Sequence, residues 1–236
     1  LALMIPFISI RAQMYSYIFF LLELIFIEKF LRSKQYKYLI PLSILPLFII
    51  NFHAGTIYFY FIIIFVYLLN YIKIKIGKIE YNHEYIKNLK YLLIPIICGV
   101  LLTFVNPFGY RQILYCAKTL NNSFINSYIS EFQPMTIKNS VGILFYGSLL
   151  IITLSLIFTK NKIKLERTLL LLGTTFMSLM SLRHFSLFII FTIPCLEYVE
   201  EFFTILKDLS YKGITKTGKK VLKITIISLY ISIYIF

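Results

Sequence analysis

The 236-residue sequence has no tryptophan, one aspartate (Asp208) and few charged residues of any kind. Charged side chains make up 14% of the chain and apolar side chains 59%, and the mean hydropathy is +0.81. Ordinary soluble domains carry about 25% charged and about 45–50% apolar residues, and disordered chains are poor in apolar residues. The composition therefore excludes both classes and indicates a polytopic membrane protein.

Cysteine is also scarce, and its spacing is uninformative. Cys98, Cys116 and Cys195 form no Cys-x-x-Cys pair and no Cys/His ligand pattern, so we expect neither a disulfide framework nor a structural zinc site. Cys98 and Cys195 lie in apolar runs and are read as small buried side chains. We expect no cofactor, although the sequence leaves a divalent metal ion open.

Both ends of the chain, Leu1 and Phe236, lie inside apolar stretches, and no signal peptide is visible. We expect residues 1–236 to form a single transmembrane domain that is a piece of a longer membrane protein.

Long apolar runs recur along the chain. A membrane-spanning helix needs about 20 apolar residues, and lipid requires every backbone polar group to be paired within the protein. The predicted fold class is all-α: a transmembrane helix bundle of about eight spans. The predicted spans are residues 14–31, 36–52, 56–72, 89–105, 141–159, 167–182, 185–203 and 220–236.

Basic residues are distributed unequally between the connecting loops. The chain has 24 Lys and Arg against 10 acidic residues, and 19 of the 24 fall in four loops, at 29–37, 73–90, 160–167 and 207–223. These four loops alternate along the eight predicted spans with loops that hold only five. The positive-inside rule places the lysine-rich loops in the cytoplasm of a bacterium. The expected partners of these loops are anionic membrane lipids rather than nucleic acid.

The longest segment between predicted spans is 106–140. Asn106 and Pro107 resemble a helix start, with Asn106 as the cap. Apolar residues then follow at helical spacing, at Tyr110, Ile113, Leu114, Ala117 and Leu120. We expect an amphipathic helix that lies on the outer membrane surface.

Polar residues of chemically active types occupy the low-charge loops. Arginines suit a phosphate group because the guanidinium offers a planar fork of donors. Histidine can carry protons, and Glu131 is the only carboxylate in these loops, which makes it the candidate general base or metal ligand. We predict Glu131 and His53 as catalytic, Arg11, Arg111, Arg183 and His184 as donor-phosphate ligands, and Gln13, Asn51 and Asn106 as residues that shape the pocket.

Each of these residues also has a simpler reading. Arginines at helix ends often reach to lipid headgroups, a histidine there often caps a helix, and Glu131 can be a solvated loop acid. Asn106-Pro107 is a turn and helix start first. Glu23 lies within a predicted span, and we expect it to pair with Lys29 or to reach toward the lipid headgroups rather than to relay protons.

Five short motifs in order resemble a known family. They are Arg11-Ala12-Gln13, Asn51-Phe52-His53-Ala54-Gly55, Asn106-Pro107-Phe108-Gly109, Glu131-Phe132-Gln133-Pro134 and Arg183-His184-Phe185. Their order and spacing are similar to those of bacterial polytopic proteins related to the GT-C glycosyltransferases, which include protein mannosyltransferases and aminoarabinose transferases. The chain departs from the family pattern at Ala12, Ala54 and Phe132, where the family carries Pro, Gly and Trp.

The resemblance implies a transferase that takes a sugar from a polyprenyl-phosphate donor at the extracytoplasmic face. The family's catalytic acid, usually Asp in the first outer loop, has no counterpart here, and we expect it to lie outside this piece. Two other functions fit the same residues. One is a transporter or flippase of an anionic lipid or solute, and the other is a non-catalytic membrane assembly subunit.

Overall fold

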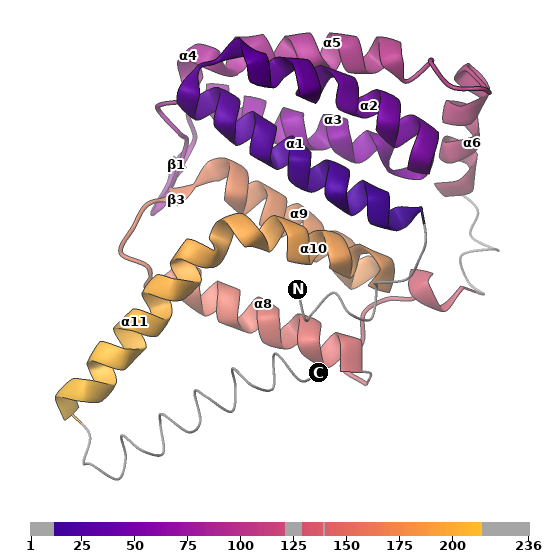
Figure 1. Cartoon of the computed structure of the whole chain (residues 1–236). Coiled ribbons are helices and arrows are strands. Elements are labelled where there is room, and N and C mark those ends of the chain that lie inside the picture. The colour runs from indigo at the N-terminus through magenta and orange to yellow at the C-terminus, as the bar shows by residue number, and fades with distance from the viewer. Residues whose placement is uncertain (1–11, 121–128, 139, 214–236) are drawn as a thin grey trace. The chain divides into compact units, whose positions relative to one another are not determined.

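The computed structural model describes residues 12–120, 129–138 and 140–213, and within these residues the regular elements are helices and three two-residue strands (Figure 1). The all-α fold class is therefore confirmed. The chain forms two compact units. The N-terminal unit holds the described residues up to Ser130 together with Lys164–Leu172, and the C-terminal unit holds Glu131–Ile163 and the described residues from Gly173 onward. The single domain over residues 1–236 stays a prediction.

The N-terminal unit is built from antiparallel helices joined by short turns. Its α-helices are α1 (Gln13–Ser33), α2 (Leu39–His53), α3 (Ile57–Leu68), α4 (Ile86–Leu89), α5 (Leu93–Leu102) and α6 (Tyr110–Leu120). One-turn 3-10 helices extend them at η2 (Tyr36–Tyr38), η3 (Ala54–Thr56), η4 (Leu69–Ile72) and η5 (Lys90–Leu92), and β1 (Lys75–Ile76) pairs antiparallel with β2 (Ile79–Glu80).

The stretch from Tyr36 to Ile72 folds back on itself at η3. The hydroxyl of Tyr60, on α3, donates hydrogen bonds to the carbonyl oxygens of Leu42 on α2, at 2.9 Å, and of Pro95 on α5, at 3.1 Å. Residues 42 and 60 would lie about 27 Å apart along one straight helix, so these bonds require a hairpin. The two halves of the hairpin match the predicted spans at 36–52 and 56–72.

The turns of the N-terminal unit gather at two ends. At the lysine-rich end, the ring of Tyr36 packs against that of Tyr91, at 5.1 Å between ring centres, and Arg32 bonds Tyr85. At the other end, called the low-charge end, Asn51 bonds the backbone of Val105. Polar groups that are far apart in sequence thus meet at the ends of the helices.

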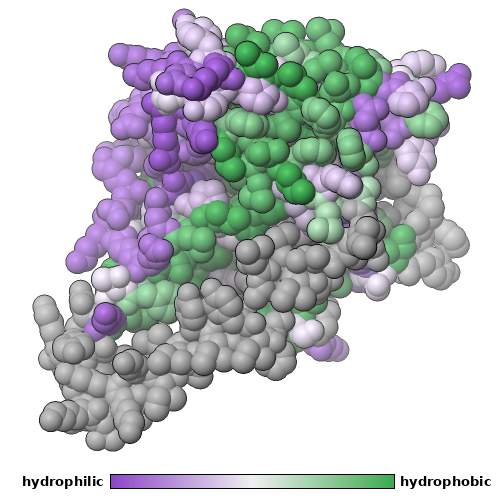
Figure 2. All heavy atoms as spheres, in the orientation of Figure 1, coloured by the Kyte–Doolittle hydropathy of each residue, from purple (hydrophilic) through white to green (hydrophobic). Residues whose placement is uncertain are grey.

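The sides of these helices carry large apolar groups on the surface. Ile40 on α2 is 64% exposed, and on α5 Ile97 is 61% and Leu101 65% exposed. Figure 2 shows hydrophobic surface over the helices of the N-terminal unit, with hydrophilic groups at the two ends. An apolar surface of this kind is typical of contact with lipid or with another protein.

The C-terminal unit contains α8 (Ser140–Phe158), part of α9 (Leu165–Met180), α10 (Phe185–Thr192) and α11 (Leu196–Gly213). The shorter elements are η6 (Ser130–Phe132), β3 (Ile163–Lys164), η7 (Leu182–His184) and η8 (Ile193–Cys195). Phe145 of α8 packs edge-on against Phe185 and Phe188 of α10, at 5.8 and 5.2 Å between ring centres. At the opposite end of α8, the carboxylate of Glu201 accepts hydrogen bonds from Thr159, Lys160 and Asn161.

Seven of the eight predicted spans coincide with helical segments, and 220–236 lies outside the described residues. Within 185–203, the one-turn 3-10 helix η8, with Pro194 in its first turn, lies between α10 and α11. The number of spans stays a prediction. By length and apolar composition, two stretches of the described residues are able to cross a membrane, Tyr36–Ile72 and Ser140–Phe158.

Gly99 allows α5 to approach α2 and α3 closely. A Cβ atom at this position would lie 3.0 Å from Tyr60, 3.1 Å from Pro46 and 3.2 Å from Phe61. We expect Gly99→Leu to lower the free energy of unfolding in detergent by about 1–3 kcal/mol, because the larger side chain forces the helices apart.

Gly147 on α8 serves as the matched control, since nothing lies within 4 Å of a Cβ atom there. Gly147→Leu should leave the unfolding transition unchanged or raise it, because leucine favours helix more than glycine does. Equal losses in the two variants would contradict the close contact at Gly99.

Candidate functional site

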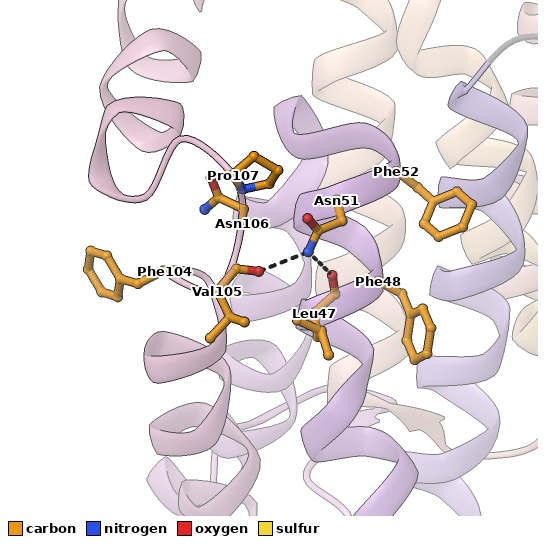
Figure 3. A pocket seen from close by; sticks show the side chains of 8 residues that line it. All are labelled: Leu47, Phe48, Asn51, Phe52, Phe104, Val105, Asn106 and Pro107. Atoms are coloured by element: carbon orange, nitrogen blue, oxygen red, sulfur yellow. Dashed lines mark hydrogen bonds between the residues drawn. The ribbon is translucent and has the colours of Figure 1, made fainter.

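An open groove of about 590 Å³ lies at the low-charge end of the N-terminal unit, where α2 and α5 finish (Figure 3). Aromatic and aliphatic side chains form most of its lining, with Asn51 and Asn106 as its polar members. The side-chain amide of Asn51 donates to the carbonyl oxygens of Leu47, at 2.8 Å, and of Val105, at 2.9 Å. Asn51 therefore ties the end of α2 to the end of α5 and fixes the width of the groove.

Asn106 forms a turn rather than a helix cap. Its side-chain oxygen accepts a hydrogen bond from the backbone N–H of Phe108 at 2.9 Å, and its amide donates to the carbonyl oxygen of Thr103 at 2.8 Å. Gly109, with φ +54°, follows, and α6 begins at Tyr110. The prediction that Asn106 caps this helix is wrong. Its side-chain oxygen bonds the backbone N–H two residues later and so forms an Asx turn before α6 begins.

His53 ends α2 beside two hydroxyl groups. Its Nδ1 atom is hydrogen-bonded to Oγ of Ser16 on α1 at 2.8 Å, and Ser16 Oγ lies 3.0 Å from the hydroxyl of Thr56. Ser16 is completely buried, so it cannot reach a substrate directly. The cluster joins α1 to the α2–α3 turn and holds the imidazole ring in one orientation.

The other predicted site residues described in this unit are not among those that line the groove. Gln13 opens α1 and is half-buried, whereas Arg111 is exposed on α6, which packs against η3. Arg11 lies outside the described residues.

In the C-terminal unit, the loop that carries Glu131 is bonded to the segment between α9 and α10. Met135 N–H donates to Leu179 O at 3.1 Å, Leu182 N–H donates to Gln133 O at 3.0 Å, and Ser181 Oγ donates to the carbonyl oxygen of Glu131 at 3.0 Å. The loop is thus held along residues 179–182. This pairing brings the predicted Glu131 motif beside the predicted Arg183-His184 motif.

Arg183 and His184 are both half-buried next to this loop. The guanidinium of Arg183 lies over the ring of Phe132, 5.3 Å from its centre, which orients the side chain. Nδ1 of His184 is 3.3 Å from the carbonyl oxygen of Met177. Burial lowers the pKa of His184, and the neighbouring positive charge of Arg183 adds to this effect.

The structure therefore gathers the predicted residues into two groups. Asn51, His53 and Asn106 lie at one end of the N-terminal unit, and Glu131, Arg183 and His184 lie together in the C-terminal unit. That all of them line one cavity stays a prediction. Among the described residues, no group of three or more His, Cys, Asp or Glu side chains is arranged to hold a metal ion.

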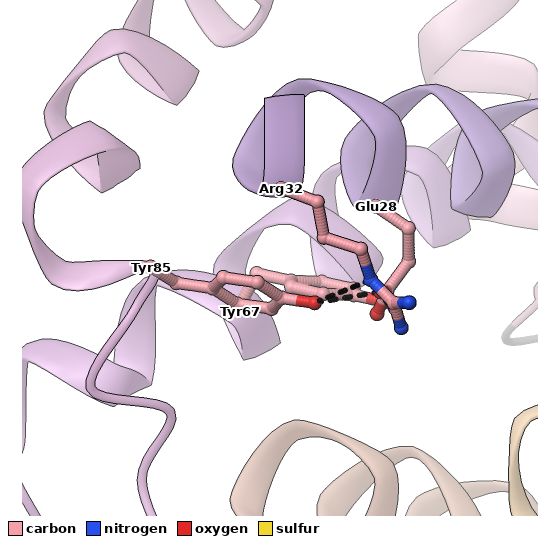
Figure 4. A network of polar contacts seen from close by, with 4 residues as sticks. All are labelled: Glu28, Arg32, Tyr67 and Tyr85. Carbon is pink, nitrogen blue, oxygen red and sulfur yellow. Dashed lines mark hydrogen bonds and ion pairs between the residues drawn. The ribbon is translucent and has the colours of Figure 1, made fainter. Parts of the chain in front are cut away.

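A partly buried polar network at the lysine-rich end was not predicted from the sequence (Figure 4). The carboxylate of Glu28 accepts hydrogen bonds from the hydroxyls of Tyr85, at 2.6 Å, and Tyr67, at 3.0 Å, and from Nε of Arg32, at 3.0 Å. Burial raises the pKa of Tyr85, and the Glu28 carboxylate raises it further, so this phenol remains a donor. The sequence signal for this network is limited to the spacing of Glu28 and Arg32, which are four residues apart and therefore lie on the same face of a helix.

Glu23 does not form the expected pair with Lys29. Its side chain is completely buried in α1, and neither carboxylate oxygen has a hydrogen-bond partner. A buried carboxyl without a partner is costly when charged.

Comparison with known proteins gives no relative: no protein-family model, no curated protein and no solved structure matches this chain.

The environment of His184 predicts an acid-sensitive fold. The lowered pKa means that the unfolded chain binds a proton at higher pH than the folded chain does. Stability should therefore be constant above the ordinary histidine pKa of about 6.5 and should fall as the pH drops below it. We expect thermal unfolding in detergent to show this loss, and His184→Gln to reduce it.

His83 provides the matched control because it is exposed, in the turn before α4. His83→Gln should leave the pH dependence as it is in the unchanged protein. An identical pH profile for His184→Gln and the unchanged protein would contradict the effect of burial.

Proposed function

We propose that this chain is the membrane-embedded part of a glycosyltransferase-like protein that takes a sugar from a polyprenyl-phosphate donor at the extracytoplasmic face of the bacterial inner membrane. The observation that carries the proposal is the hydrogen-bonded pairing of the Glu131 loop with residues 179–182, which brings the backbone of Glu131 next to the segment that carries Arg183 and His184. A cation and a candidate base at the end of an apolar helical unit suit a ligand whose phosphate lies at the bilayer surface.

The apolar helices support the membrane part of the proposal. In the most apolar 18 residues of Ser140–Phe158, only 22% of the residues are buried within the protein. A core helix of a soluble protein would be mostly buried, so the low burial of this helix suits contact with lipid. In the proposed arrangement eight spans cross the membrane and the lysine-rich loops face the cytoplasm, as the excess of basic residues there favours.

The chemistry needs two kinds of group. A hydroxyl of the acceptor attacks the anomeric carbon of the sugar, the bond from that carbon to the phosphate oxygen breaks, and the polyprenyl phosphate leaves with the electron pair. Arg183 would stabilise the charge that grows on the leaving phosphate, with His184 as a second donor. Glu131 would take the proton of the acceptor hydroxyl, and His53 is the second candidate for proton transfer.

One observation favours the alternative of a transporter. Glu23 is a completely buried carboxyl group without a hydrogen-bond partner, on a helix that is predicted to span the membrane. Such groups often mark proton pathways in transport proteins. A proton-coupled transporter would lose uptake of its anion into vesicles when Glu23→Gln is introduced, whereas a transferase would keep its activity.

The test of the proposed function is the binding of undecaprenyl phosphate to the full chain in lipid nanodiscs. We expect Arg183→Gln to weaken binding about tenfold to a hundredfold, because a hydrogen bond to a charged group contributes about 1.5–3 kcal/mol. Arg183→Lys should weaken it less, since the charge remains while the planar fork is lost.

Lys138→Gln is the control, as it removes an exposed cation from the same unit. Its binding should match that of the unchanged protein. Loss of binding to the same degree in both variants, or no loss in Arg183→Gln, would exclude Arg183 as the phosphate ligand and the proposed site with it.

A further inference from the structure

α6 presents an exposed strip that combines apolar and basic side chains. Tyr110 is 60% exposed and Leu114 is 52% exposed, and Arg111 and Lys118 are exposed as well. Positions 111 and 118 are seven residues apart, which places them on the same side of a helix, next to the line through 110 and 114. The two cations therefore border an apolar strip along the helix.

The other side of α6 is occupied by the protein. Gln112, Ile113 and Cys116 are half-buried, and α6 packs against η3. Contact with the N-terminal unit thus fixes which side of α6 remains uncovered.

The charge of this strip has one sign. No acidic residue occurs between residues 102 and 130, so nothing on α6 or in its flanking segments neutralises Arg111 and Lys118. Exposed apolar groups beside unopposed cations complement a phospholipid surface, which offers acyl chains below a layer of phosphates.

The direction of α6 fits this partner. Figure 1 shows α6 running crosswise to α1, α2, α3 and α5, at the end of the N-terminal unit where α5 finishes. If these four helices cross the bilayer, a helix crosswise to them at their end lies along the bilayer surface.

We propose that the exposed strip of α6 binds the anionic phospholipids of the leaflet at the low-charge end, with Tyr110 and Leu114 among the upper acyl chains and Arg111 and Lys118 on lipid phosphates. This assigns Arg111 to the surrounding lipid rather than to the phosphate of a sugar donor. The inference rests on the membrane-spanning part of the proposed function and is independent of the transferase activity.

The absence of tryptophan from the chain allows a single tryptophan to report on one position. Leu114→Trp places the reporter on the exposed strip, and Ile97→Trp places it on the apolar side of α5, where residue 97 is 61% exposed. Each variant of the full chain is reconstituted into vesicles of phosphatidylcholine and phosphatidylglycerol. Fluorescence quenching is then measured with lipids brominated either near the glycerol or near the chain ends.

We expect the Leu114→Trp reporter to be quenched from near the glycerol and the Ile97→Trp reporter from near the chain ends. Basic residues attract anionic lipid roughly fivefold each. Brominated phosphatidylglycerol should therefore quench the Leu114→Trp reporter about twofold or more better than brominated phosphatidylcholine at the same mole fraction. Adding Arg111→Gln and Lys118→Gln should make the two lipids equal, whereas adding Lys37→Gln and Lys75→Gln, at the other end of the unit, should not.

The outcomes separate the two proposals. If the Ile97→Trp reporter is not quenched by either lipid, the membrane-spanning arrangement itself is wrong. If the Ile97→Trp reporter is quenched and the Leu114→Trp reporter is not, the assignment of α6 to the lipid surface is overturned and the spans stand. Quenching of the Leu114→Trp reporter without any preference for phosphatidylglycerol overturns the role of Arg111 and Lys118.

Discussion

Much of the apolar surface of this chain is left uncovered by the protein itself. Side chains such as Ile97 on α5 and Ile40 on α2 are more than half exposed, yet the backbone groups of these helices are bonded within each helix. Water would oppose this arrangement, because each apolar group left in contact with water costs free energy in proportion to its area. In the proposed membrane arrangement, lipid would remove this cost and would also favour helices whose backbone needs no outside partner. The helical fold and the position of the polar groups are what such a constraint predicts.

Several polar contacts between helices lie at the helix ends. At the lysine-rich end, two tyrosines and Arg32 surround the Glu28 carboxylate. At the low-charge end, Asn51 joins two helices, and Ser16 bonds His53. The Glu131 loop and Arg183 meet in the same way in the C-terminal unit. The proposed chemistry depends on this last pairing, whereas Glu23 is a carboxyl group buried within α1.

The helical segments were predictable because each one is a long apolar run, and seven of the eight predicted runs coincide with helices. The break at η8 was not predictable from apolar character, since Ile193-Pro194-Cys195 is as apolar as its neighbours and only the proline marks the change. The turn at Asn106 was read as a cap because a cap and an Asx turn use the same residue. Contacts such as those of Ser16 with His53 and Tyr85 with Glu28 join residues 37 and 57 positions apart. Such pairs depend on how the helices pack, which periodicity alone does not specify.

Sidedness tests the membrane arrangement most directly. In a background where Cys98, Cys116 and Cys195 are replaced by serine, single cysteines are introduced as Gly55→Cys and Lys138→Cys at low-charge loops, and as Lys37→Cys and Lys162→Cys at lysine-rich loops. A membrane-impermeant maleimide added to intact cells should label the first two variants and leave the last two unlabelled until the cells are opened. Labelling of Gly55→Cys and Lys138→Cys from opposite sides of the membrane would contradict a shared extracytoplasmic end, and with it the proposed site.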